Sequence, residues 1–217
     1  MLDLGNIFIL GDSYSTFTGI IPEGYSAWYT PEPSPQTDVT RADQIWHQRL
    51  LAQVKGQIIR NDSWSGSTIC CTGYEGKDFS HCAFINRLDK YIESGFFRDN
   101  RVDTLFVLGA TNDSWSDAPL GKAQYADWTR EDLYQVLPAI GYLARTLGEN
   151  FPKTRILYIV NTELKEEITK GIHEACTRFG IPILMLTKID KLSGHPTIAG
   201  MQQIADQVVA FLEVQEK

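Results

Sequence analysis

The stretch NIFILGDSYS, residues 6–15, decides the fold class of this 217-residue chain. Its first half, Asn6 to Leu10, is an apolar run, typical of a strand that is buried on both faces of a parallel sheet. Gly11 and the polar residues after it end the strand. Similar apolar runs recur along the chain and alternate with amphipathic segments, which predicts βαβ units around a parallel sheet.

One three-layer domain covering residues 1–217 is therefore expected. Its strands are predicted at 6–10, 57–60, 104–108, 155–160 and 181–186. Its helices are predicted at 42–54, 84–92, 131–147, 162–179 and 197–212. Pro138 predicts a kink or a late start in the third helix, and Asn161 or Thr162 is the expected N-cap of the fourth. Residues 14–40 form a long irregular insertion loop with four prolines, and such loops are usually functional or mobile.

The composition is that of an ordinary globular protein, with 43% hydrophobic and 22% charged residues. The net charge of −7 argues against nucleic-acid and anionic-membrane partners, because both select clustered Lys and Arg. No apolar run approaches the roughly 18 residues of a membrane span, and the N-terminus shows no signal-peptide pattern. A cytoplasmic location is the expectation at face value, with export after signal removal as the alternative; the sequence does not indicate an oligomeric state.

The four cysteines leave the redox compartment open, because a dense disulfide framework is absent from the sequence. A bridge from Cys70 or Cys71 to Cys82 and free thiols are both compatible with it. His81 beside Cys82 superficially suggests a metal cluster. The spacing matches no standard zinc pattern, so we expect no metal.

Four polar blocks follow predicted strands, at the edge of a parallel sheet where ligands bind. They are Gly11-Asp12-Ser13, Gly66, Asn112-Asp113 and His195-Pro196. A serine hydroxyl becomes a nucleophile when a base accepts its proton, and histidine is the usual base. Backbone N–H groups and an asparagine amide are suitable donors to a developing oxyanion. The set predicts acyl transfer.

These four blocks, in this order and across almost the whole chain, resemble those of the SGNH (GDSL-type) hydrolases. The resemblance implies a flavodoxin-like α/β/α sandwich with a five-stranded parallel sheet. It implies Ser13 as nucleophile, His195 as base, and an oxyanion hole formed by Ser13, Gly66 and Asn112. The implied activity is hydrolysis of carboxylic esters or removal of O-acetyl groups from sugars. No metal or organic cofactor is implied.

Two positions depart from the family pattern. The family usually places an aspartate three residues before its histidine, where this chain has Leu192, and the nearest acid is Asp190. Either Asp190 still reaches His195, or a backbone carbonyl orients the imidazole and the site is a dyad. The family often has glycine at the position of Ala110, so a slightly altered turn is expected there.

Aromatic residues near the blocks suggest a substrate surface, with Trp64, Trp115 and Tyr14 as the candidates. The alternative is that they pack the long loop onto the domain. The expected substrate is a small-molecule or glycan ester. The alternatives are a carbohydrate-binding protein on the same fold that has lost catalysis, or a lipase or thioesterase of the same family. A flavin or nucleotide protein is a third reading, which no phosphate-loop motif supports.

Overall fold

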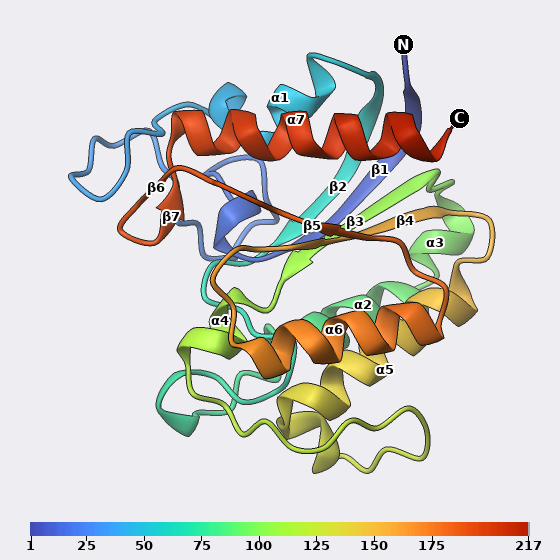
Figure 1. Cartoon of the computed structure of the whole chain (residues 1–217). Coiled ribbons are helices and arrows are strands. Elements are labelled where there is room, and N and C mark those ends of the chain that lie inside the picture. The colour runs from blue at the N-terminus through green and yellow to red at the C-terminus, as the bar shows by residue number, and fades with distance from the viewer. Residues whose placement is uncertain (217) are drawn as a thin grey trace.

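The computed structural model describes residues 1–216, and these contain a five-stranded parallel sheet in the order β2-β1-β3-β4-β5. The strands are β1 (Asp3–Gly11), β2 (Lys55–Ser63), β3 (Thr104–Gly109), β4 (Arg155–Val160) and β5 (Ile183–Met185). Helices cover both faces of the sheet (Figure 1), which confirms the predicted three-layer fold. Each predicted strand is present, and β2 extends beyond its predicted range at both ends.

The two faces of the sheet pack against different helices. On one side lie α1 (Trp46–Leu51) and α7 (Ile198–Gln215), and on the other lie α2 (Phe84–Glu93), α5 (Val136–Asn150) and α6 (Glu166–Arg178), as Figure 1 shows. Alternate residues of β1 point to opposite faces. Ile7 and Ile9 join the core under α1 and α7, whereas Phe8 and Leu10 join the core under the other helices. Both faces are thus apolar, as the continuous apolar run predicted.

Shorter helical segments connect these layers. They are the α-helices α3 (Phe96–Asp99) and α4 (Thr111–Trp115) and the 3₁₀ turns η1 (Ser13–Ser15), η2 (Ala42–Gln44), η3 (Tyr74–Gly76) and η4 (Asp132–Tyr134). The first helix predicted at 42–54 is wrong in extent. It divides into η2 and α1, because Ile45 between them has an extended backbone with φ −70° and ψ 145°.

Two other predicted helix starts can be compared with the structure. Helix α5 begins at Val136, which places Pro138 in the first turn, where its missing N–H is not needed. The late start is therefore confirmed. The predicted N-cap of α6 at Asn161 or Thr162 is wrong, because α6 begins at Glu166 after Lys165. The Asn161 side chain instead donates hydrogen bonds within the sheet edge described below.

A short antiparallel hairpin precedes α7 and was not predicted. Its strands are β6 (Lys191–Leu192) and β7 (His195–Pro196), which lie together at one end of the sheet (Figure 1). Ser193 and Gly194 connect them with positive φ values of 50° and 77°. A two-residue turn with both φ values positive matches the twist of the strands it joins. The hairpin determines where His195 lies.

The insertion loop at 14–40 is anchored to the domain. Phe17, Tyr29 and Val39 are buried in the core beneath α1 and α7. The Tyr29 hydroxyl also donates to Pro196 O at 2.9 Å. The loop therefore packs directly beside the β6–β7 hairpin.

The cysteines are buried free thiols within residues 1–216, so the bridge from Cys70 or Cys71 to Cys82 is not formed. In the same part of the chain, none of the helices has both the length and the apolar character required to cross a bilayer.

Candidate active site

Ser13 and His195 meet at the carboxyl end of β1, although 182 residues separate them. The Ser13 Oγ lies 3.0 Å from His195 Nε2. Asp12 caps η1 by accepting a hydrogen bond from Tyr14 N at 3.0 Å, which is a structural role. This cap fixes the turn that presents the Ser13 hydroxyl. The predicted nucleophile and base are therefore within hydrogen-bond distance.

A backbone carbonyl orients the imidazole. His195 Nδ1 lies 3.1 Å from Ser193 O. A carbonyl oxygen only accepts hydrogen bonds, so Nδ1 carries the proton and Nε2 has a free lone pair. The Ser13 hydroxyl then donates to Nε2. The imidazole with its proton on Nδ1 is the tautomer that a general base requires.

The structure does not bring Asp190 to His195. Asp190 is exposed, and its carboxylate accepts a hydrogen bond from the Thr197 hydroxyl. Leu192, at the position where the family usually has its aspartate, is the ladder partner of His195 and is 41% exposed. The sequence left two arrangements open, and the structure has the second: a Ser13–His195 dyad whose imidazole is oriented by a backbone carbonyl.

Burial dominates the electrostatics of His195. The residue is only 5% exposed, and burial lowers the pKa of its imidazole to about 4. The bond to Ser193 O opposes this shift, while the positive charge of Lys191 adds to it. The imidazole is therefore neutral at pH 7 and able to accept a proton.

Gly66 and Asn112 lie where the sequence predicted oxyanion donors, in the segments after β2 and β3. Gly66 has a φ of 83°, and a Cβ added there would meet no atom within 4 Å. This conformation favours glycine, and the space beside it is open. The Asn112 Nδ2 donates one hydrogen bond to Ser67 O at 2.9 Å. An amide nitrogen has two N–H groups, so one remains for a ligand.

Tyr74 is a site residue that sequence reasoning missed. Its hydroxyl donates to Asn112 Oδ1 at 2.7 Å, so both ends of the amide are held. Burial raises the pKa of Tyr74 to about 12, which keeps the hydroxyl protonated as a donor.

Ala110, just before the helix α4 that carries Asn112, has a φ of 77°. It adopts the left-handed conformation that glycine favours.

Arg87 on α2 is a second residue that the sequence did not reveal. Its guanidinium forms a buried ion pair with the Asp62 carboxylate, with side chains only 3% and 0% exposed. It also donates to Gly11 O at 3.0 Å and to Ser67 Oγ at 3.2 Å. Arg87 thus ties the ends of β1 and β2 to the segment that holds Asn112.

The predicted substrate-binding aromatics differ in accessibility. Trp115 is 42% exposed, with its ring centroid 5.6 Å from that of His195. Trp64 is half-buried and lies against Tyr25 at 4.2 Å between centroids. Tyr14 is fully buried, and its hydroxyl donates to Gly194 O at 2.6 Å. Through this hydrogen bond Tyr14 braces the hairpin, and its ring presents no exposed face for stacking on a substrate.

Trp28, from the insertion loop, covers the imidazole. Its ring is parallel to that of His195, with centroids 3.7 Å apart and an interplanar angle of 7°. This contact joins residues from opposite ends of the chain. Sequence spacing alone carries no signal for it.

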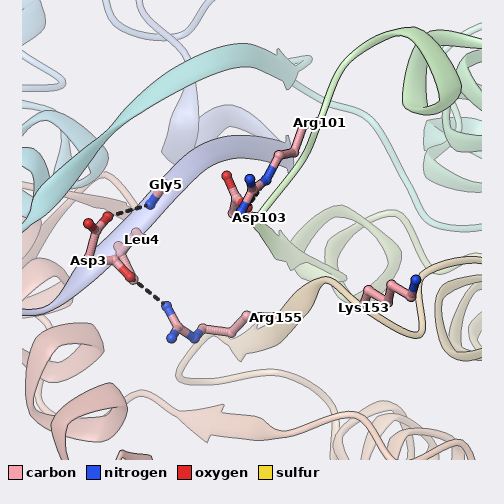
Figure 2. Close-up of a pocket in the computed structure, with 7 residues that line it drawn as sticks. All are labelled: Asp3, Leu4, Gly5, Arg101, Asp103, Lys153 and Arg155. Atoms are coloured by element: carbon pink, nitrogen blue, oxygen red, sulfur yellow. Dashed lines mark hydrogen bonds and ion pairs between the residues drawn. The ribbon is translucent and has the colours of Figure 1, made fainter.

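A cavity of about 510 Å³ lies at the opposite, amino-terminal end of β1, β3 and β4 (Figure 2). Its charged groups are largely occupied with one another: Arg101 pairs with Asp103, and Arg155 donates to Asp3 O and pairs with Glu216. The Ser13–His195 pair lies at the other end of the sheet. This cavity is therefore not part of the candidate active site.

Known proteins resemble this chain in sequence and in fold. The sequence model of the family described as GDSL-like Lipase/Acylhydrolase matches residues 5–212. A crystal structure from Bacteroides ovatus, described as a GDSL-like lipase, shares 40% identity over 98% of this chain and 99% of its own, with a TM-score of 0.88. Another from Bacteroides uniformis, with the same description, shares 41% identity over 97% and 96% of the two chains, with a TM-score of 0.89.

More distant structures share the fold alone. One is a family two carbohydrate esterase from Clostridium thermocellum in complex with cellohexaose, at 14% identity over 99% of this chain and 65% of that one, with a TM-score of 0.61. No curated protein matches the chain. The family match over nearly the whole length, together with two relatives at 40% and 41% identity, shows that this chain belongs to the GDSL-like lipase/acylhydrolase family.

Proposed function

We propose that this protein is a serine esterase that removes small acyl groups, with O-acetyl groups on carbohydrates as its substrate class. The observation that carries the proposal is the 3.0 Å contact between Ser13 Oγ and His195 Nε2, with Nδ1 held by Ser193 O. Family membership supports ester hydrolysis in general, and this pair supplies a nucleophile and a base for it.

The reaction follows from the arrangement of these groups. Ser13 Oγ attacks the ester carbonyl carbon as its proton moves to His195 Nε2. The oxyanion accepts hydrogen bonds from the N–H groups of Ser13 and Gly66 and from Asn112 Nδ2. The imidazolium then protonates the leaving alkoxide as the C–O bond breaks. A water deprotonated by His195 hydrolyses the acyl-enzyme and releases the acid.

Two features support a small acyl group on a sugar. Ser13 is only 2% exposed, which favours a small acyl group over a bulky one at this hydroxyl. The accessible rings near the site, Trp115 and Trp64, offer apolar faces of the kind that stack on pyranose rings. The Clostridium thermocellum carbohydrate esterase, in complex with cellohexaose, has the same fold, and at 14% identity it supports the proposal through the fold alone.

A release assay tests the proposal. Wild type and Ser13→Ala are compared on 4-nitrophenyl acetate, on longer acyl esters and on acetylated glycans. The matched control is Ser94→Ala, which removes an exposed serine at the end of α2. We expect a loss of roughly 10⁴-fold or more for Ser13→Ala and no change for the control. Equal rates for wild type and Ser13→Ala would refute the nucleophile, and a preference for long acyl chains would favour a lipase or thioesterase.

A second candidate is a carbohydrate-binding protein on the same fold without catalysis. It is favoured by one observation, that His195 Nδ1 faces a carbonyl where a carboxylate is usual. Saturable glycan binding by wild type, together with no acyl release from any ester of the panel, would select this function.

A further inference from the structure

Aromatic rings lie around His195, and one of them, the indole of Trp28, is stacked on its imidazole. The Trp28 ring is stacked on the imidazole, with centroids 3.7 Å apart and planes inclined by 7°. The other rings are tilted or edge-on and more distant, at 5.5, 6.3 and 5.6 Å for Tyr14, Tyr29 and Trp115. Among these four rings, the Trp28 indole is the one that is stacked face to face on the imidazole.

The backbone around Trp28 holds the indole in this position. Trp28 N–H donates to the Thr16 hydroxyl at 2.9 Å, and that hydroxyl donates to Ser13 O at 2.9 Å. Thr18 N–H donates to Tyr29 O at 3.0 Å, which closes the same part of the loop. The Trp28 Nε1 is buried without a hydrogen-bond partner in residues 1–216. The ring position is therefore set by stacking and by backbone anchors, not by its own N–H.

The proposed reaction creates a positive charge at this point. When His195 accepts the proton of Ser13, its Nδ1–H faces Ser193 O, which is a dipole and not a charge. The hydroxyls of Tyr14 and Tyr29 are committed to the carbonyls of Gly194 and Pro196. The charged group of the hairpin that acts on the imidazole is Lys191, whose positive charge disfavours the imidazolium. The Asp190 carboxylate is occupied by Thr197. Asp190 therefore does not give His195 the stabilisation that an aspartate gives in a triad.

We propose that Trp28 is a positioning residue for His195 and that its indole face stabilises the imidazolium by a cation–π interaction. The inference rests on the proposed function of the Ser13–His195 pair, because the imidazolium forms in that reaction. A cation within about 6 Å of an aromatic centroid is attracted to the ring quadrupole, most strongly to tryptophan and most strongly when desolvated. The stack at 3.7 Å over a buried histidine meets both conditions.

The test uses Trp28→Phe, which keeps a weaker π face, and Trp28→Leu, which keeps apolar cover without one. The control is Trp128→Leu, because the Trp128 ring packs against Tyr142 and not against His195. We measure kcat and KM on 4-nitrophenyl acetate against pH, and we titrate the ring C–H resonance of His195 by NMR. Thermal melts establish that each variant is folded.

We expect kcat/KM at pH 7 to fall about tenfold to thirtyfold in Trp28→Leu and less in Trp28→Phe, with KM unchanged. The pKa of His195 should fall in the same order, by about one unit in Trp28→Leu. If Trp28 only excludes water, the sign reverses, because hydration raises the pKa of the imidazole towards its ordinary value. A pKa in Trp28→Leu that is unchanged or raised, or a loss confined to KM, overturns the inference.

The two readouts separate this inference from the proposed function. The NMR titration requires no turnover, so a lowered pKa in Trp28→Leu together with an inactive wild type would refute the esterase and support the stack. An active wild type with an equally active Trp28→Leu would support the esterase and refute the role of Trp28.

Discussion

Replacing Asp190 distinguishes a triad from a dyad at this site. The Asp190 carboxylate accepts a hydrogen bond from the Thr197 hydroxyl, and Thr197 is the N-cap of α7, where it also accepts from Gly200 N at 3.1 Å. The imidazole is oriented by Ser193 O at 3.1 Å. Removing the carboxylate therefore changes a helix cap and leaves the partners of His195 in place.

The expected loss of activity on replacing Asp190 differs by orders of magnitude between the triad and the dyad. An orienting acid in a serine triad contributes about 10⁴-fold to kcat. In the dyad, Asp190→Ala and Asp190→Asn should retain kcat/KM within about threefold. The lost hydrogen bond to Thr197 should cost about 1 kcal/mol of unfolding free energy, which lowers the melting temperature by about 2–4 °C in a chain of this size.

The assay measures kcat/KM at pH 7 on 4-nitrophenyl acetate, with a thermal melt of each variant. Asp206→Ala is the matched control, because it also removes an exposed carboxylate, in this case one that lies on α7 itself. A loss of 10³-fold or more in a folded Asp190→Ala protein would refute the reasoning. It would mean that the β6–β7 hairpin rearranges during catalysis to bring the carboxylate to His195.

Three further predictions follow from the site. Arg87→Met leaves the Asp62 carboxylate buried without its cation, so we expect the free energy of unfolding in urea to fall by about 3–5 kcal/mol. A fall below about 1 kcal/mol would contradict the stabilising role of the Arg87–Asp62 pair. Tyr74→Phe removes the hydroxyl that holds Asn112, so kcat should fall up to about tenfold at unchanged KM, and a change in KM alone would instead indicate substrate contact. Because burial lowers the pKa of His195 to about 4, the loss of kcat/KM caused by protonation of this base should be centred near pH 4; an NMR titration of the His195 ring centred near pH 6.5 would show that the imidazole is hydrated in solution.

Much of the fold was predictable because burial on both faces of a parallel sheet leaves a direct imprint on local sequence. The apolar runs located each strand of the sheet, and Pro138 located the start of α5. Helix boundaries were less predictable where tertiary partners compete with the helix. Asn161 resembles an N-cap locally, yet its amide donates to the Tyr14 hydroxyl and to Thr111 Oγ1, each at 3.1 Å.

The β6–β7 hairpin shows a similar limit. It depends on positive φ at Ser193 and Gly194, and a Ser-Gly pair is compatible with several turns. The sequence therefore left open whether Asp190 or a carbonyl orients the imidazole. Only the direction of the hairpin, which points Ser193 O at Nδ1, distinguishes the two arrangements.

By itself the sequence determined the parallel sheet and the family, and it predicted that Ser13, Gly66, Asn112 and His195 meet at one edge. It could do so because strand ends in such a sheet converge by topology. The tertiary structure decided what surrounds these groups: the Trp28 ring stacked on the imidazole, the hydrogen bond from Tyr74 to Asn112, and the buried Arg87–Asp62 ion pair. Those contacts join residues far apart in the chain through packing, and local sequence carries no periodic signal for them.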